Sequence, residues 1–161
     1  MFDASTIKTL QKLEDPGLLL VGAKRDGESN VMAIGWGFVG VMWGLRVFIV
    51  LVRSSRFTHE FIEDGDEFTV NVPTGRMDKK VSHCGEVSGR KHDKFKECGF
   101  TLIKGKKVKA PVIKECKIHY ECRVVHKLKV NPELVPDKVK KTFYAKDDFH
   151  TVYFGEILAS Y

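Results

Sequence analysis

Three segments of the chain contain residue types and spacings that could bind a ligand. The first is Asn30-Val31-Met32-Ala33, which follows a turn and opens a predicted strand. Its small or unbranched side chains would leave backbone N–H and C=O groups within reach of a flat ligand. An ordinary strand start explains the same residues, so this segment alone does not decide between the two interpretations.

The second segment, Arg53-Ser54-Ser55-Arg56-Phe57-Thr58, lies where a predicted strand ends and a predicted helix begins. Free N–H groups at a helix N-terminus, together with arginine and hydroxyl side chains, favour binding of a phosphate. The alternative is capping of the helix by Ser54 or Ser55, with both arginines solvated.

The third segment, Cys84–Phe95, concentrates Gly, Ser, Arg and Lys in a predicted loop. Such loops often approach a ligand through their backbone, but the same composition is common in flexible surface loops. A ligand-binding interpretation of this loop therefore needs support from elsewhere in the chain.

The cysteines do not predict a metal site. Cys116, His119 and Cys122 fall in one predicted strand, where the two cysteines would share a face roughly 20 Å apart and the histidine would lie on the other face. Cys84 and Cys98 are expected to lack a close cysteine partner, which favours free thiols in a reducing compartment.

Short strands dominate the elements that must position these segments. A helix is expected over Ser54–Asp64, because Phe57 and Phe61 lie on one face and Gly65 ends it. Met77–Cys98 reads as two short helical pieces, and Asn131–Asp148 as a loop with a short helix. The predicted strands are Gly17–Ala23, Asn30–Val41, Arg46–Arg53, Glu67–Val72 (half-buried), Phe100–Ile103, Val108–Val112, Lys117–Val130 and Thr151–Ala159.

This pattern predicts a mainly β protein, a closed or partly closed antiparallel barrel with a few short helices. The regular helical crossovers of a doubly wound sheet are missing, as is a dinucleotide glycine fingerprint followed by a helix. With 161 residues, 43% of them hydrophobic and 30% charged, we expect a single globular domain over 1–161.

The formal charge of +6 would suit nucleic acid, an anionic membrane or a phosphorylated small ligand. The lysines lie in short runs at 104–109 and 138–141, which read as solvated surface. Glycines and Arg46 interrupt the apolar stretch from 31 to 52, which predicts strands and not a membrane helix. We expect a cytoplasmic protein that binds neither nucleic acid nor membrane.

Five elements, in the same order along the chain, resemble those of the flavin reductase-like family with the FMN-binding split barrel, which includes flavoredoxins and ferric reductases. The resemblance extends from about Gly17 to Ala159. It is carried by Asn30–Ala33, by Arg56, Thr58 and Ile62, by Asp66–Pro73 with aspartate where the family usually has glycine, by Cys84–Phe95, and by His150 followed by Gly155-Glu156-Ile157.

The resemblance implies FMN as cofactor and a homodimer, with some flavin contacts coming from the second subunit. It places the flavin ring along the backbone of Asn30, Val31, Met32 and Ala33. It also assigns the ribityl chain and phosphate to Val52, Arg53, Ser54, Arg56 and Thr58, and an approach to the flavin to Cys84, Ser88, Gly89, Arg90 and Lys94.

The implied activity is electron transfer from NAD(P)H through FMN to free flavin, ferric iron or a protein acceptor, with the flavin carrying the chemistry. Lys94 and Arg90 would favour the anionic reduced flavin, and His150 would line the nicotinamide side unless it is a buried structural histidine. A non-enzymatic FMN electron carrier and a flavin-free nucleic-acid-binding barrel are the alternatives.

Two departures from the family pattern concern access to the flavin. The chain has Gly35-Trp36-Gly37 where the family often has Ser-Trp-Phe, and Asn131–Asp148 is longer than the usual connection.

Overall fold

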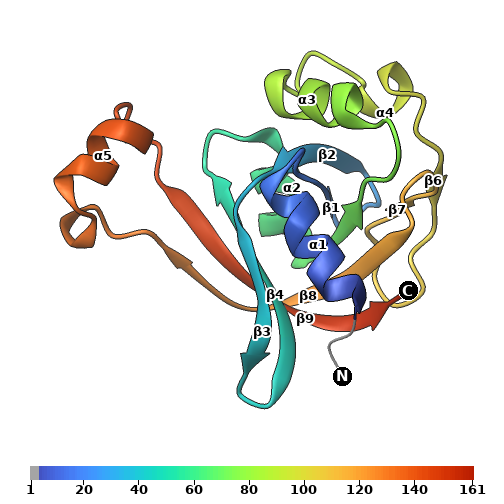
Figure 1. Ribbon diagram of the computed structural model, residues 1–161, viewed down its shortest axis with the longest axis horizontal. Coiled ribbons are helices and arrows are strands. Elements are labelled where there is room, and N and C mark those ends of the chain that lie inside the picture. Colours follow the sequence, from blue (N-terminus) through green and yellow to red (C-terminus); the bar gives the residue numbers. More distant parts are fainter. Residues whose placement is uncertain (1–3) are drawn as a thin grey trace.

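The computed structural model describes residues 4–161, and within them one antiparallel sheet holds seven strands in the order β2-β1-β5-β8-β9-β4-β3 (Figure 1). A separate short pair, β6–β7, lies beside it. The strands are β1 (Leu18–Ala23), β2 (Ser29–Ile34), β3 (Gly37–Met42), β4 (Leu45–Arg53), β5 (Glu67–Val72), β6 (Leu102–Ile103), β7 (Val112–Ile113), β8 (Ile118–Lys129) and β9 (His150–Ser160).

Short helices fill the connections and pack around this sheet. They are α1 (Ala4–Glu14), α2 (Phe57–Gly65), α3 (Asp78–Glu86), α4 (Lys94–Glu97), a 3-10 turn at Pro132–Leu134, and α5 (Asp137–Phe143). Helices α3 and α4 lie together over β2, on the side of the body opposite the β3–β4 turn (Figure 1). None of the helices described in residues 4–161 has both the length and the apolar character that a membrane span requires.

Strand β1 shows why the sheet needs helices on its outer face. Successive side chains of a strand point to opposite faces. Leu18 and Leu20 enter the main core inside the curved sheet, whereas Leu19 and Val21 enter a second core beneath α3 and α4. Every residue of β1 is buried. The second core therefore fixes the α3–α4 layer, and with it the Cys84–Phe95 segment, against the sheet.

Strand β9 crosses the middle of the sheet at a close approach that only glycine allows. A Cβ at Gly155 would lie 2.4 Å from Cζ of Phe68 and 2.8 Å from Cβ of Cys122. Two register irregularities in the β8–β9 pairing flank this point. The glycine lets the strands curve around the Phe68 ring.

Strand β5 was expected to be half-buried, with its polar face in solvent. The structure buries this polar face as well. Thr69 donates a hydrogen bond to the carbonyl of Pro111, 2.7 Å away, and Asn71 Oδ1 accepts one from the amide of Ile113 at 2.9 Å. The segment that carries β7 covers these side chains and satisfies them.

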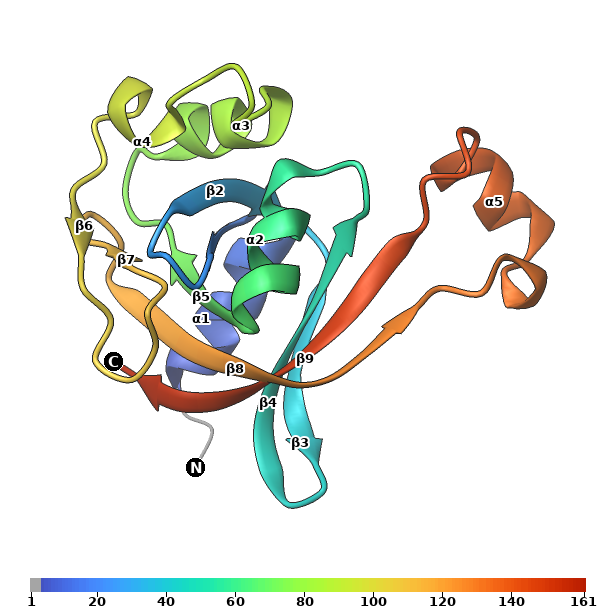
Figure 2. The ribbon, with the colours of Figure 1, turned by 180° about the vertical axis from the view of Figure 1, so that it is seen from behind.

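Two ribbons project from the body in both views (Figures 1 and 2). One is the β3–β4 hairpin, whose turn at Trp43-Gly44 has positive φ at both residues, as a two-residue hairpin turn requires. The other consists of the outer ends of β8 and β9 and carries α5. Lys138, Lys140 and Lys141 lie on this short helix, as predicted.

Several element boundaries differ from the sequence prediction. The helix predicted to begin at Ser54 begins at Phe57, since Ser54 and Ser55 form a turn. The strand predicted over Val108–Val112 is restricted to β7, because the backbone at Val108 bonds to the Glu121 carboxylate and not to a neighbouring strand. Helix α1 was not predicted.

Candidate functional site

Two adjoining clefts lie between the ends of β2 and β4, the start of α2 and the α3–α4 loop. Their volumes are about 190 and 180 Å³. Together they reach the lower part of the range for small-molecule sites, roughly 300–1,000 Å³. Met32, Arg53 and Arg56 line both clefts, so the two form one continuous groove.

The floor of this groove is held by a buried pair of side chains. Asn30 Nδ2 donates a hydrogen bond to Thr58 Oγ1 at 2.8 Å, which ties β2 to the first turn of α2. Gly89 of the α3–α4 loop lies against the same asparagine, since a Cβ at Gly89 would lie 2.1 Å from Asn30 Oδ1. Glycine is therefore required for the loop to close onto β2.

The start of α2 is rich in groups that bind anions. Its N-cap residue is Arg56, and within the described residues no side chain caps it, so the alternative of capping by Ser54 or Ser55 does not hold. Arg53 and Arg56 both line the groove, and Arg56 Nη1 donates to the carbonyl of Gly85 at 3.0 Å. An anion placed here would meet two guanidinium groups and the N-terminal end of a helix.

An internal carboxylate already uses some of these donors. Asp148, which precedes β9, accepts hydrogen bonds from the amide of Ser55 at 3.2 Å and from its hydroxyl at 2.5 Å. Arg53 donates to the Asp148 carbonyl at 2.7 Å. The long connection before β9 thus reaches the groove, and its carboxylate would repel a bound anion.

Lys94 contributes a third cation, from within the protein. Its side chain is 4% exposed, and its ammonium donates to the carbonyls of Cys84 at 3.0 Å and Val87 at 3.3 Å. Burial lowers the pKa of Lys94 from its usual value. The two carbonyls hold the ammonium at the groove wall.

The prediction that Cys84 and Cys98 lack a close cysteine partner is wrong. Their Sγ atoms lie 3.8 Å apart, and both thiols are free. Helices α3 and α4 bring them together although they are distant in sequence. Burial, with a further contribution from Cys98, raises the pKa of Cys84 to about 12, so the thiol is protonated at neutral pH.

The other two cysteines do not share a strand face. Cys116 precedes β8 and lies in the second core, whereas Cys122 lies in the main core. His119 bonds through Nδ1 to Asn71 Oδ1 at 2.9 Å. The prediction that Cys116 and Cys122 lie on one face of a single strand is therefore wrong, because Cys116 precedes the strand and packs into a different core.

His150 lies at the far end of the groove. Its Nδ1 is 2.7 Å from the Tyr144 hydroxyl, and its ring is 5.0 Å from that of Trp36. Burial, reinforced by the positive charge of Arg53, lowers the pKa of His150 to about 4. The imidazole is therefore neutral at pH 7.

Most of the predicted site residues meet in this groove, but four do not. Val31 and Val52 are buried in the two cores, Ser54 lies in the exposed turn before α2, and Arg90 forms an ion pair with Glu60 at the rim. The predicted residues that line the groove are Asn30, Met32, Ala33, Arg53, Arg56, Thr58, Cys84, Ser88, Gly89, Lys94 and His150.

Sequence reasoning missed several residues that line the groove, among them Trp36, Leu51 and Asp148. Trp36 could have been predicted, because it follows the Asn30–Ala33 segment closely and lies in the Gly35-Trp36-Gly37 departure from the family pattern. Leu51 could also have been predicted, because it lies between the buried residues Val50 and Val52 of β4 and so points to the opposite face. Asp148 carried no signal, because its position depends on how the β8–β9 ribbon folds back.

Comparison with known proteins places this geometry in a family. The model of the flavin reductase like domain matches residues 15–161. The chain belongs to this family. Four of the five sequence elements contribute residues to the groove, the exception being Asp66–Pro73. The predicted split-barrel fold is confirmed by solved relatives with that fold.

Individual relatives agree with this assignment. An uncharacterized protein of Archaeoglobus fulgidus is 36% identical over 129 residues, covering 80% of this chain and 63% of that protein. A flavoredoxin from Methanosarcina acetivorans is 35% identical with a TM-score of 0.69, covering 90% of this chain and 67% of the other. The FMN-binding domain of a flavin reductase-like enzyme from Shewanella baltica has a TM-score of 0.67 and 21% identity, over 96% and 73% of the two chains, and so shows the fold alone.

Proposed function

We propose that this flavin reductase-like chain binds FMN in the groove between β2, α2 and the α3–α4 loop and passes electrons from NAD(P)H to an acceptor. The carrying observation is the convergence of Arg53, Arg56 and Lys94 on one groove beside the start of α2. This set of cations fits a phosphate dianion. The choice of FMN is supported by two similar solved structures, one described as a flavoredoxin and the other as an FMN-binding domain.

The chain's own residues would bind and orient, whereas FMN would supply the ability to accept electrons in pairs and release them singly. Arg53 and Arg56 hold the anionic end. Lys94 places a positive charge at the wall of the groove, which would favour a negatively charged reduced ring. His150 is neutral and its Nδ1 is bonded to Tyr144, so it serves as a polar wall and not as a proton donor at pH 7.

Anaerobic reduction tests the activity. NADH or NADPH added to the FMN-loaded protein should bleach the blue absorbance, and dithionite serves as the control that shows the bound flavin is reducible. Free flavin, ferric iron and candidate acceptor proteins, added afterwards, should restore the absorbance at different rates. If dithionite bleaches the flavin and neither nicotinamide does, reduction by NAD(P)H is wrong and the chain is an electron carrier that a partner protein reduces.

A homodimer is the second part of the proposal. Large apolar side chains are exposed on both projecting ribbons: Phe38 is 62% exposed, Trp43 69% and Leu134 81%. Apolar patches of this kind mark interfaces. A second copy packed on the ribbons would bury them and could bring its own residues to the groove.

Replacing Trp43 by lysine tests the dimer. The charge would lie at the exposed tip of the β3–β4 hairpin, where it costs the folded monomer little but opposes burial against a second copy. We expect sedimentation to show a dimer for the natural chain and a shift towards monomer for Trp43→Lys. Lys107→Ala, a change in an exposed loop away from both ribbons, is the control and should sediment like the natural chain. A natural chain that sediments as a monomer would contradict the proposal.

A further inference from the structure

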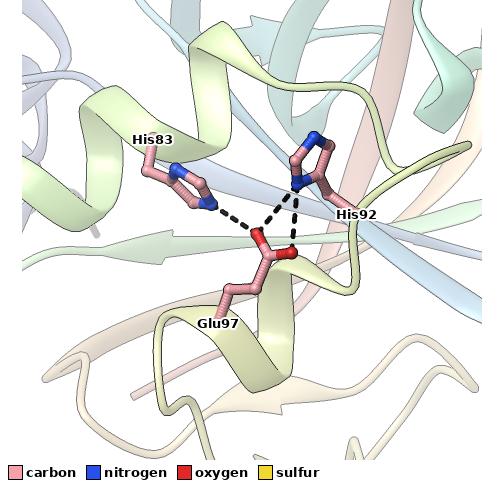
Figure 3. Close-up of side chains that lie close together, drawn as sticks. All are labelled: His83, His92 and Glu97. Atoms are coloured by element: carbon pink, nitrogen blue, oxygen red, sulfur yellow. Dashed lines mark hydrogen bonds and ion pairs between the residues drawn. The ribbon is translucent and has the colours of Figure 1, made fainter.

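The α3–α4 layer carries a second cluster of reactive side chains, distinct from the groove. His83 from the last turn of α3, His92 from the connecting loop and Glu97 from α4 point toward one another (Figure 3). One ligand atom from each lies within 4.8 Å of the others. The cluster had no signal in the sequence analysis, because the three residues belong to different elements.

The distances between the ligand atoms are hydrogen-bond distances, somewhat shorter than those around a bound metal ion. His83 Nε2 lies 2.6 Å from Glu97 Oε2, and His92 Nδ1 lies 3.0 and 3.3 Å from the two carboxylate oxygens. Tetrahedral ligands at a distance of roughly 2.1 Å from zinc are separated by roughly 3.4 Å. Shifts of an ångström or less would therefore turn this hydrogen-bonded set into a coordination sphere.

We propose that His83, His92 and Glu97 form a binding site for a divalent transition-metal ion, with Zn²⁺ as the ion that the ligand set suits best. Two imidazoles and one carboxylate supply three protein ligands, which leaves at least one position open for water or another ligand. Such a set disfavours Mg²⁺, which prefers oxygen ligands and retains its water.

The surroundings allow an ion to reach this site from solvent. The side chains of His83, Glu97 and His92 are 35%, 38% and 41% exposed, and they line an open cleft of about 430 Å³. Lys79 and Lys80 border the same cleft. Their charges weaken the attraction for a bare cation and favour an anion as the remaining ligand.

The ion would act on the neighbouring groove through the backbone. Its ligands come from α3, the loop and α4, so it would cross-link the segment 83–97 that also carries Cys84, Ser88, Gly89 and Lys94. His83 and Cys84 are adjacent, and Cys98 of the metal cleft lies 3.8 Å from Cys84 of the groove, measured between Sγ atoms. The metal cleft and the groove are thus separated only by the Cys84–Cys98 pair at this point.

Zinc titration of the untagged, metal-stripped protein, with a chromophoric chelator as competitor, tests the site. We expect one Zn²⁺ per chain, no binding of Mg²⁺, and an affinity lowered about tenfold or more in His83→Gln, His92→Gln and Glu97→Gln. His126→Gln, a change at an exposed histidine outside the cluster, is the matched control and should bind Zn²⁺ like the natural chain. Cys98→Ala should also leave the affinity unchanged.

Equal zinc affinity in the three ligand variants and the natural chain would overturn the proposal, as would loss of zinc in Cys98→Ala or no binding at all. Hydrogen exchange gives a second readout: Zn²⁺ should slow exchange of backbone amides within 83–97 in the natural chain and not in Glu97→Gln. Because the titration needs no flavin, its result is independent of whether the chain binds FMN.

Discussion

Arg56→Ala should weaken FMN binding by about 1.5–3 kcal/mol, roughly ten- to a hundredfold in dissociation constant. Arg56 lines both halves of the groove and stands at the N-cap of α2, where it can form charge-assisted hydrogen bonds to a phosphate. Its side chain is exposed and has one protein acceptor, the Gly85 carbonyl, so stability should change little. Fluorescence titration of FMN measures the effect.

Two further variants make this result specific. Arg123→Ala removes an exposed arginine on β8 that pairs with Glu67 and does not line the groove. This variant should leave FMN affinity unchanged. Asp148→Asn should act in the opposite direction and strengthen FMN binding, because it removes a negative charge that occupies the Ser55 donors. Unchanged affinity in Arg56→Ala would exclude Arg56 from the phosphate site.

Glu121→Ala should lower the free energy of unfolding by about 2–4 kcal/mol. This carboxylate on β8 is fully buried and accepts hydrogen bonds from the backbone amides of Lys106, Lys107 and Val108 and from the Tyr161 hydroxyl, at 2.6–3.1 Å. The substitution leaves these donors without their acceptor. Urea unfolding measures the loss, and Glu133→Ala, at an exposed position, is the control expected to change little.

The same carboxylate should make stability depend on pH. Burial by itself would raise the pKa of Glu121, but the hydrogen bonds from Lys106, Tyr161 and Lys107 outweigh it and hold the pKa below its usual value. A lowered pKa in the folded state means that the stabilisation is present above the unfolded value of about 4.3 and is lost as the pH falls further. Glu121→Gln should therefore lose less stability on acidification than the natural chain. An identical pH dependence in both proteins would contradict this account.

The sequence determined the class of the fold and the position of most of the site. Alternating apolar residues, short spacings and turn residues define the strands locally, because the two-residue period of a strand is visible in the residues themselves. The segments at 30–33, 53–58 and 84–95 were recognisable because their glycines, arginines and hydroxyls are unusual for purely structural strands. Eleven of the residues named from them and from His150 line one groove.

Which polar residues are buried depends on the tertiary structure. The prediction of a half-buried strand places Thr69 and Asn71 on its exposed face, yet both are fully buried, as is Glu121. The segment that carries β7 folds over these side chains and supplies backbone partners. The energetic cost of burying such a group depends on partners distant in sequence, and no local pattern reveals those partners.

Three clusters of reactive side chains also form only in three dimensions. The Cys84–Cys98 pair, the carboxylate of Asp148 at Ser55, and the convergence of His83, His92 and Glu97 each join elements that the sequence separates. Residue types and spacing indicated most of the residues that line the groove. Which of these residues meet depends on two features of the packing. Helices α3 and α4 pack on the second core, and the β8–β9 ribbon folds back towards the groove. Contact between residues distant in sequence is set by how whole elements pack and not by spacing along the chain.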